Sequence, residues 1–568
     1  MQPETNAFFQ SLEQEVGIDH DALRSLHMKH GSADLEFLQL IVETRIVEKD
    51  RACRLWGDAI GFAYVDPLAS LVTPEAIGQI PKAITRKGMA LPLYLINDVL
   101  TVAMANPADE ALVRRLENIS LHQVSPVFAL PVEILDAIEI HYASADEITE
   151  SIEHFERTQQ RLLESLTSDD LENLGENSGI VEILDALMFY AISERASDVH
   201  LEPLEDRARV RLRVDGNLRE YFRVSHILAR ALTARLKVLC KVNISESRFP
   251  QDGRFEIRMG AGKSEFRVSF LPTLYGQKVV IRILAGAGQK TLINLDRMMI
   301  SGKILSPMRR LLQSPNGIFF VTGPTGSGKT TTLYAAIHEL NQPLVNISTI
   351  EDPIEITLPG LNQSQVNSHI DLSFGLLLRA LMRQDPDIIL LGEIRDLETA
   401  KIATEAALTG HLVLSSLHTN TAPQAIIRLV EIGIEPYMVA PSILGVLAQR
   451  LAARICEKCK EAYFPSRSLL EKYFRDIPEG VEVPFYHGRG CPHCRNTGTS
   501  GRVAFHELVL VSNKMRSLIA ENAGQTELAA AAAELGYKPL RYDGLKKVLL
   551  GLTTPEEVDR HSVLEWSS

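Results

Sequence analysis

The feature that most constrains this chain is Gly323-x-x-x-x-Gly328-Lys329-Thr330, the pattern of a phosphate-binding P-loop. The apolar run 317–322 precedes it and predicts a buried strand, and apolar residues at helical spacing follow it. Strand, loop and helix are the order that such a site requires, because the helix N-terminus attracts anions. The residues expected to hold ATP are Gly323, Pro324, Thr325, Gly326, Ser327, Gly328, Lys329, Thr330 and Thr331.

Composition narrows the class of protein. With 568 residues the chain is too long for one core, and 45% hydrophobic with 23% charged residues is typical of globular domains. The net charge of −13 disfavours a general nucleic-acid binder. The sequence shows neither a signal-peptide pattern nor an apolar run of membrane-spanning length, which predicts a cytoplasmic chain that can dock on membrane partners.

Acidic residues follow two predicted strands downstream of the P-loop. Glu351 and Glu355 lie in Glu-Asp-Pro-Ile-Glu after one apolar run, and Glu393 ends another. Carboxylates at strand ends beside a P-loop are suited to holding Mg²⁺ and polarising a water molecule. Because Gly392 stands where many P-loop enzymes have Asp, Glu393 is expected to hold Mg²⁺ with Thr330 or to act on the water, supported by Glu351 and Glu355.

Two histidines, His411 and His418, bracket the predicted strand 412–417. A lone histidine is usually structural. A pair at the ends of a strand that neighbours the nucleotide strands indicates γ-phosphate sensing or coupling between subunits.

Four of the six cysteines form two Cys-x-x-Cys pairs, Cys456 with Cys459 and Cys491 with Cys494. In a cytosolic chain this pattern indicates metal more than disulfides, and four thiolates suit a tetrahedral Zn²⁺ site. The separation of the pairs exceeds that of most zinc ribbons. His493 is an alternative ligand, but two matched thiolate pairs make it the weaker choice.

Several arginines lie on predicted strands between residues 179 and 286. Strand arginines are commonly found on a solvated face, but beside an ATPase domain a guanidinium can stabilise the γ-phosphate in the transition state. The sequence alone does not choose among the candidates, which are Arg209, Arg211, Arg213, Arg267 and Arg282.

These motifs together resemble the secretion ATPases of the type II secretion and type IV pilus systems, the GspE/PilB group. The resemblance covers roughly residues 179 to 568. Beyond the P-loop, the acidic residues and the cysteines, it is carried by Ala196-Ser-Asp-Val-His-Leu-Glu, Pro250-Gln-Asp-Gly-Arg, Arg383-Gln-Asp-Pro-Asp and Ala448-Gln-Arg-Leu. Some relatives bind cyclic di-GMP through Arg-Leu-Gly motifs, and this sequence contains none.

The resemblance implies an α/β multidomain chain with a RecA-like ATPase core, a PAS-like α+β second domain, a zinc-binding insertion and a helical C-terminus. The expected domains are an N-terminal docking domain (1–145), an acidic linker (146–178), the second domain (179–288), the ATPase domain (289–455), the four-cysteine region (456–505) and a helical region (506–568).

The same resemblance implies a function and its partners. ATP hydrolysis by a homo-hexameric ring at the cytoplasmic face of the inner membrane would drive pilin or pseudopilin fibre assembly, with a membrane platform protein and a docking protein as partners. Residues 427–451 and the C-terminal tail favour type II secretion over the alternative, pilus assembly. Less favoured interpretations are a DNA translocase and an inactive docking protein. The resemblance also implies that four arginines contact the nucleotide. They are Arg267 and Arg282 of the second domain and Arg379 and Arg383 of the ATPase domain.

Overall fold

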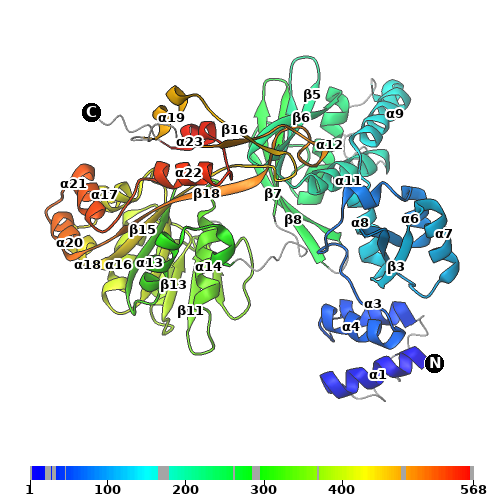
Figure 1. Cartoon of the computed structure of the whole chain (residues 1–568), viewed down its shortest axis with the longest axis horizontal. Coiled ribbons are helices and arrows are strands. Elements are labelled where there is room, and N and C mark those ends of the chain that lie inside the picture. Colours follow the sequence, from blue (N-terminus) through cyan, green and yellow to red (C-terminus); the bar gives the residue numbers. More distant parts are fainter. Residues whose placement is uncertain are drawn as a thin grey trace. The chain divides into compact units, whose positions relative to one another are not determined.

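The computed structural model of this chain consists of two compact units, Met1–Thr291 and Leu292–Ser568 (Figure 1). Among the residues that the structure describes, no helix has the length and apolar character of a membrane span. The described residues are 3–18, 27, 34–44, 46–163, 178–259, 262–284, 294–367, 370–474 and 482–562.

The first unit begins with a helical layer and a small sheet. The helices bury Phe8, Phe37 and Trp56 in one apolar cluster. In the sheet β1 and β2 are antiparallel, and β3 is parallel to β2. The elements are α1 (Pro3–Val16), α3 (Asp34–Glu43), α4 (Lys49–Ile60), α5 (Pro74–Ile77), α6 (Lys82–Gly88), β1 (Ala90–Ile96), β2 (Val99–Met104), α7 (Glu110–Ser120), β3 (Gln123–Phe128) and α8 (Pro131–His141).

Helix α9 (Ala145–Leu163) occupies the first part of the predicted acidic linker. Its Ile148, Ile152 and Phe155 are buried in the apolar cluster of the following sheet. Their spacing places them on one helix face, so the acidic residues cover only the other faces. This part of the chain is therefore a packed helix and not a solvated linker. The remaining predicted linker residues, 164–177, lie outside the described residues.

A six-stranded antiparallel sheet in the order β6-β5-β4-β9-β8-β7 completes the first unit. One face, with Val199 and Leu201, packs into the same apolar cluster as helices α11 and α12. The opposite face carries the alternate residues of β4, Asp198, His200 and Glu202. The elements are α11 (Ser178–Ser193), β4 (Ala196–Pro203), β5 (Ala208–Val214), β6 (Asn217–Val224), α12 (His226–Cys240), β7 (Gln251–Met259), β8 (Gly262–Thr273) and β9 (Gly276–Ile283).

The second unit is built on a seven-stranded sheet in the order β12-β11-β13-β14-β10-β15-β18, parallel except for β18. Strand β10 is buried on both faces, because Ile318 and Phe320 join one apolar cluster and Phe319 and Val321 join another. The strands are β10 (Gly317–Thr322), β11 (Ile347–Glu351), β12 (Asn362–Gln365), β13 (Ile388–Leu391), β14 (Leu412–Leu417), β15 (Ile443–Ile455) and β18 (Thr499–Leu510).

Helices pack on this sheet and continue beyond it. They include η2 (Leu295–Met298), α13 (Gly302–Leu312), α14 (Lys329–Leu340), α15 (Phe374–Leu381), α16 (Leu397–Leu408), α17 (Ala422–Ile432) and α18 (Pro436–Ser442). The four-cysteine region holds β16 (Lys460–Tyr463), α19 (Arg467–Tyr473), β17 (Phe485–Gly488) and η4 (Pro492–Cys494).

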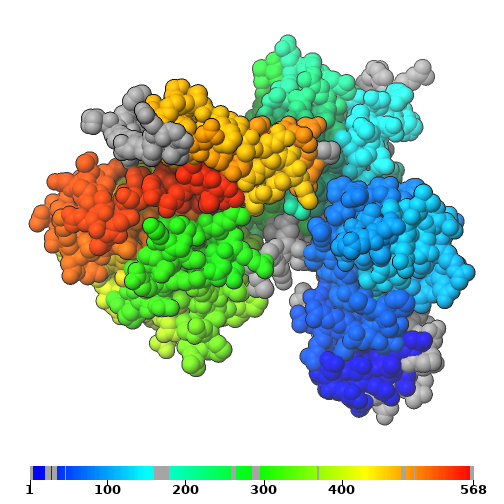
Figure 2. Space-filling model, viewed as in Figure 1, coloured from blue at the N-terminus to red at the C-terminus, as the bar shows by residue number. Residues whose placement is uncertain are grey.

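The C-terminal region differs from the prediction at its start, because residues 499–510 form β18 of the main sheet. Helical structure begins only at Asn513. The C-terminal helices, which include all of the red surface in Figure 2, are α20 (Asn513–Ala520), α21 (Gln525–Glu534), α22 (Leu540–Leu549) and α23 (Pro555–His561).

Candidate functional site

The P-loop joins strand β10 to helix α14, as the sequence predicts. Gly326 and Gly328 have φ of 80° and 86°, a backbone conformation that other residues adopt only at a cost. Pro324, Thr325 and Gly326 form the exposed crest of the loop. The backbone N–H groups of such a loop and the N-terminus of α14 favour an anion.

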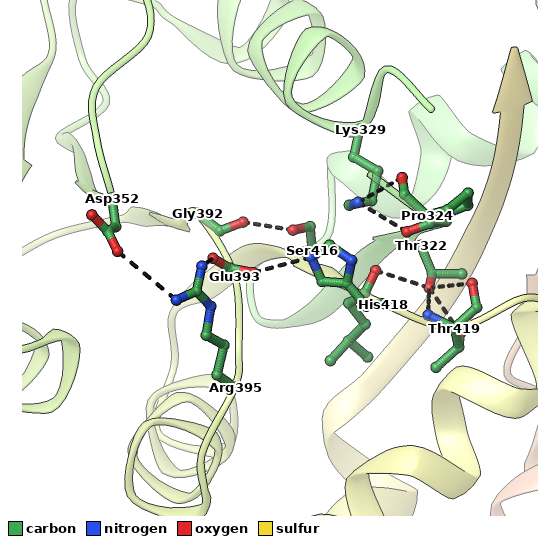
Figure 3. Close-up of polar contacts among 12 residues, drawn as sticks. Thr322, Pro324, Lys329, Asp352, Gly392, Glu393, Arg395, Ser416, His418 and Thr419 are labelled. Atoms are coloured by element: carbon green, nitrogen blue, oxygen red, sulfur yellow. Dashed lines mark hydrogen bonds and ion pairs between the residues drawn. The ribbon is translucent and has the colours of Figure 1, made fainter. Parts of the chain in front are cut away.

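Lys329 is the first residue of α14 and is buried. Its Nζ donates to Gly323 O at 2.9 Å and to Pro324 O at 3.1 Å, so the side chain folds back over its own loop (Figure 3). Burial lowers the pKa of Lys329, and the nearby charge of Glu393 opposes that shift. The ammonium group therefore lies at the loop, within the field of the predicted catalytic carboxylate.

Glu393 and His418 come together, although 24 residues separate them in the chain. Glu393 follows β13 and His418 follows β14, and these strands are parallel neighbours, so both residues lie at one sheet edge. His418 Nε2 is 3.1 Å from Glu393 Oε2, and Arg395 forms an ion pair with the other oxygen (Figure 3). Only 14% of the Glu393 side chain is exposed.

The P-loop strand and the histidine strand are bonded directly to each other. Thr322, the last residue of β10, contacts Thr419, with 2.8 Å between the two hydroxyl oxygens. Ser416 Oγ also donates to Gly392 O at 2.7 Å. These bonds hold the ends of β10, β13 and β14 in one arrangement. No sequence motif singles out either threonine, although each directly flanks a predicted site residue.

The other predicted carboxylates lie in different surroundings. Glu351 is 2% exposed and accepts hydrogen bonds from Tyr334 Oη, from Thr349 Oγ1 at 2.6 Å and from Gln363 Nε2 at 3.0 Å. This carboxylate links α14, β11 and β12, so in this structure it holds the sheet together. Glu355 is exposed, and its backbone N–H donates to Tyr334 Oη at 3.3 Å.

The two histidines are not brought together. His411 precedes β14, and its Nδ1 lies 3.0 Å from Ala406 O, whereas His418 follows the same strand. At about 3.3 Å per residue the strand separates them by about 20 Å. Only His418 therefore joins the P-loop edge of the sheet within one chain.

The two predicted arginines of the ATPase domain, Arg379 and Arg383, lie in helix α15 and just after it. Arg379 Nη2 pairs with Glu398 Oε1 at 2.6 Å, in the first turn of α16. Arg383 is exposed and its Nη1 donates to Arg379 O at 2.8 Å. Among the described residues, neither guanidinium forms a hydrogen bond or ion pair with the P-loop, so their roles at the nucleotide stay predictions.

The sheet of the first unit arranges its arginines in two groups. Arg209, Arg211 and Lys278 surround the buried Glu202 at 2.8–2.9 Å. Burial alone would raise the pKa of Glu202, but hydrogen bonds from Arg211, Lys278 and Arg209 lower it to about 2. Arg209 and Arg211 are therefore occupied in a structural cluster.

The second group is a row across five neighbouring strands. The register aligns Arg213, Asp198, Arg282, Arg267 and Arg254, from β5 to β7. Arg282 Nε donates to Asp198 Oδ1 at 3.1 Å, and 60% of the Arg282 side chain is exposed. Asp198 and Glu265, which lies 3.7 Å from Arg254, offset two of the four guanidinium charges. The row therefore keeps a net positive charge, and it contains Arg267 and Arg282, the two arginines of this sheet that the resemblance singled out.

The four cysteines form a compact cluster in the second unit. Their Sγ atoms lie within 4.8 Å of one another, with 3.9 Å from Cys456 to Cys491 and 3.7 Å from Cys494 to both Cys459 and Cys491. A tetrahedral zinc ion with Zn–S bonds of about 2.3 Å requires S–S distances of about 3.8 Å. The cluster therefore fits a metal ion.

Backbone donors complete this cluster. The N–H groups of Cys491 and Gly498 each donate to Cys494 Sγ at 3.3 Å, which favours the thiolate that a metal needs. His493 is exposed and is not a member of the cluster. The alternative ligand is thus disfavoured.

The P-loop also fits the nucleotide that its motif implies. The Ser327 hydroxyl is buried and has no hydrogen-bond partner within the described part of the chain. Thr330 follows Lys329 in the first turn of α14, and the charge of Glu393 acts on Lys329. A buried hydroxyl without a partner, an ammonium group and a carboxylate at one edge suit a Mg²⁺–nucleoside triphosphate.

Comparison with known families supports this interpretation. The family described as Type II/IV secretion system protein matches residues 173–560, and the MshEN domain matches residues 60–161. The type IV pilus assembly ATPase PilB of Myxococcus xanthus is 39% identical over 528 residues, which cover 91% of this chain and 92% of that protein.

A second relative and a solved structure complete the comparison. The type II secretion system protein E of Pseudomonas aeruginosa is 45% identical over 69% of this chain and 77% of its own length. The ATPase DotB of Legionella pneumophila is 22% identical over 67% of this chain and 95% of its own chain, with a TM-score of 0.49.

Proposed function

Because this chain belongs to the family of type II/IV secretion system proteins, we propose that it hydrolyses ATP to drive pseudopilin or pilin fibre assembly for type II protein secretion. The observation that carries the proposal is the meeting of the P-loop, Glu393 and His418 at one sheet edge. Phosphate-binding and water-activating groups must share such an edge for hydrolysis to occur.

Each residue at this edge has a proposed part. The loop N–H groups and Lys329 hold the phosphates, for which Lys329 releases its bonds to Gly323 and Pro324. Glu393 orients the attacking water, and His418 and Arg395 hold its carboxylate in place. Mg²⁺, held through Thr330 and Glu393, would neutralise charge on the phosphates.

The triphosphate needs more positive charge than the loop provides, since it carries about four negative charges and Glu393 lies close to Lys329. We assign that charge to four arginines. Arg267 and Arg282 belong to the arginine row of the first unit, and Arg379 and Arg383 would come from the ATPase domain of a neighbouring subunit. Glu351 and Glu355 retain a supporting role, with Glu351 positioning α14 through Tyr334. His411 is assigned to contacts between subunits.

The proposed assembly is a homo-hexamer at the cytoplasmic face of the inner membrane, held there by a platform protein and a docking protein. The matched MshEN domain and the helices before it would supply the docking surface. The four cysteines would hold one Zn²⁺, which fixes the fold of the region around β16 and β17.

A second candidate function is assembly of a type IV pilus. It is favoured by the extent of the match, since the pilus assembly ATPases of Myxococcus xanthus and Thermus thermophilus align with 91% and 93% of this chain. The two functions are separated in a strain that lacks the protein. Loss of exported enzymes with intact pili indicates type II secretion, and loss of pili with intact export indicates pilus assembly.

ATP hydrolysis itself is tested by Lys329→Ala in the full chain. Phosphate release should fall to background because the phosphates lose their ammonium partner, whereas Lys303→Ala, an exposed lysine of the same unit, should retain turnover. Turnover at the wild-type rate in folded Lys329→Ala protein would exclude the P-loop assignment. Strong stimulation of the wild type by added DNA would instead support the translocase interpretation.

A further inference from the structure

Gln449 lies on β15, the strand next to the P-loop strand, and is 1% exposed. Its side-chain amide contacts the P-loop and the first turns of α14. Nε2 donates to Ser327 O at 2.8 Å, and Oε1 accepts from Thr332 Oγ1 at 2.7 Å. Both ends of the amide are therefore used, one on the loop and one on the helix.

The loop also approaches Gln449 closely at two of its glycines. A Cβ atom added to Gly323 would lie 2.5 Å from Gln449 O, and one added to Gly328 would lie 2.8 Å from Gln449 Nε2. Such distances are shorter than side chains tolerate. Gly323 is thus required by its packing against the β15 backbone, whereas a Cβ on Gly328 would displace the Gln449 amide.

The bond to Ser327 O has a direct consequence for phosphate binding. The peptide group between Ser327 and Gly328 is planar and trans, so its C=O and its N–H point to opposite sides. Holding the C=O toward Gln449 turns the Gly328 N–H away from β15. Because P-loop N–H groups are the donors to the phosphates, this bond orients one of those donors.

We propose that Gln449 is a positioning residue that holds the P-loop in its nucleotide-binding shape. The inference rests on the proposed function, since it concerns the same nucleotide. A Gln side chain offers a neutral donor and an acceptor together at any pH, whereas a Glu of the same length does so only when it is protonated. Met at this position would fill the space without either bond, and an ionised Glu would place a negative oxygen against Ser327 O.

The test compares wild type, Gln449→Met and Gln449→Glu in the full chain by equilibrium binding of a fluorescent ADP analogue and by ATP turnover. Loss of both bonds should weaken ADP binding about tenfold and raise KM more than it lowers kcat. The matched control is Gln525→Met, an exposed glutamine in α21 whose Nε2 donates to Thr421 Oγ1, and it should bind like wild type. Thermal melting checks that each variant is folded.

A positioning role has a further signature in Gln449→Glu. A protonated Glu has the shape of Gln and can donate to Ser327 O while accepting from Thr332, so ADP affinity relative to wild type should recover as pH falls. Burial raises the pKa of such a carboxyl, which places the recovery between about pH 8 and about pH 6. A merely structural residue would change the melting temperature without this pH-dependent recovery.

The outcomes separate the two proposals. If wild type fails to bind ADP, the proposed function fails together with this inference. If wild type binds ADP, and folded Gln449→Met and Gln449→Glu bind it as tightly as wild type at every pH, the inference on Gln449 is wrong and the proposed function stands. If Gln449→Met does not fold, the pH dependence of Gln449→Glu decides.

Discussion

Replacing Arg282 with Ala tests whether the first unit contributes to ATP hydrolysis. Arg282 is 60% exposed, and its Nε donates to Asp198 Oδ1 at 3.1 Å. An exposed ion pair contributes about 0–1 kcal/mol to the free energy of unfolding. Asp198 is 10% exposed and retains a second ion pair, with Arg213 at 3.6 Å, when Arg282 is removed. The free energy of unfolding should therefore fall by only about 1 kcal/mol.

The expected effect on hydrolysis is far larger than the effect on stability. A guanidinium that stabilises charge on the transferred phosphoryl group contributes a factor of about 10³ or more to the rate. In a unit of this size about 1 kcal/mol lowers the melting temperature by only about 2–4 °C. Arg282→Ala should therefore stay folded while its ATP turnover falls strongly. Arg267→Ala should behave in the same way, because Arg267 is the register partner of Arg282.

Phosphate release and thermal unfolding, measured on the same preparations, provide the assay. The matched control is Arg223→Ala, because Arg223 lies on β6 of the same sheet, is 61% exposed and pairs with one carboxylate, Glu220, at 2.7 Å. It lies outside the arginine row and should keep wild-type turnover. If Arg267→Ala and Arg282→Ala also hydrolyse ATP at about the wild-type rate, the first unit does not contact the γ-phosphate. The positive charge would then have to come from Arg379 and Arg383.

Two further predictions concern the second unit. Glu393→Gln should slow phosphate release by about 10²- to 10⁴-fold, because the amide cannot act on the water. Binding of a fluorescent nucleotide should persist, and its loss would mean that Glu393 mainly holds the metal. Cys491→Ser should lower zinc below one ion per chain in elemental analysis and speed proteolysis between residues 456 and 505, because Cys491 Sγ lies 3.9 Å from Cys456 Sγ and 3.7 Å from Cys494 Sγ. Unchanged zinc content would remove Cys491 from the site.

Much of the candidate site could be predicted from sequence because its chemistry depends on short spacings. The P-loop needs its glycines, Lys329 and Thr330 within a few residues, with a strand before and a helix after, and the structure has that order. The two Cys-x-x-Cys pairs likewise identified the cluster of four Sγ atoms. The family resemblance rests on the same local patterns, and the comparisons confirm it.

Two predictions from local sequence were wrong: the solvated linker after residue 145 and the helical start of the C-terminal region. The acidic stretch after residue 145 looked like a solvated linker, yet Ile148, Ile152 and Phe155 bury one face of α9. Residues 499–510 pair with β15 over nearly their whole length, which no local feature of the C-terminal region indicated. In both cases the partner surface lies far away in the sequence.

Only the tertiary structure decided which of the candidate groups meet. Parallel strands bring their carboxyl ends to one edge, so Glu393 and His418 come together while His411 remains at the opposite end of β14. Strand register aligns Arg267 with Arg282 but leaves Arg209 and Arg211 on Glu202. The amide of Gln449 reaches Ser327 across 122 positions of sequence. The sequence by itself determined the phosphate loop, the cysteine pairs and the family, because these depend on neighbours in the chain; the pairing of distant side chains depends on sheet order and register, which long-range packing sets.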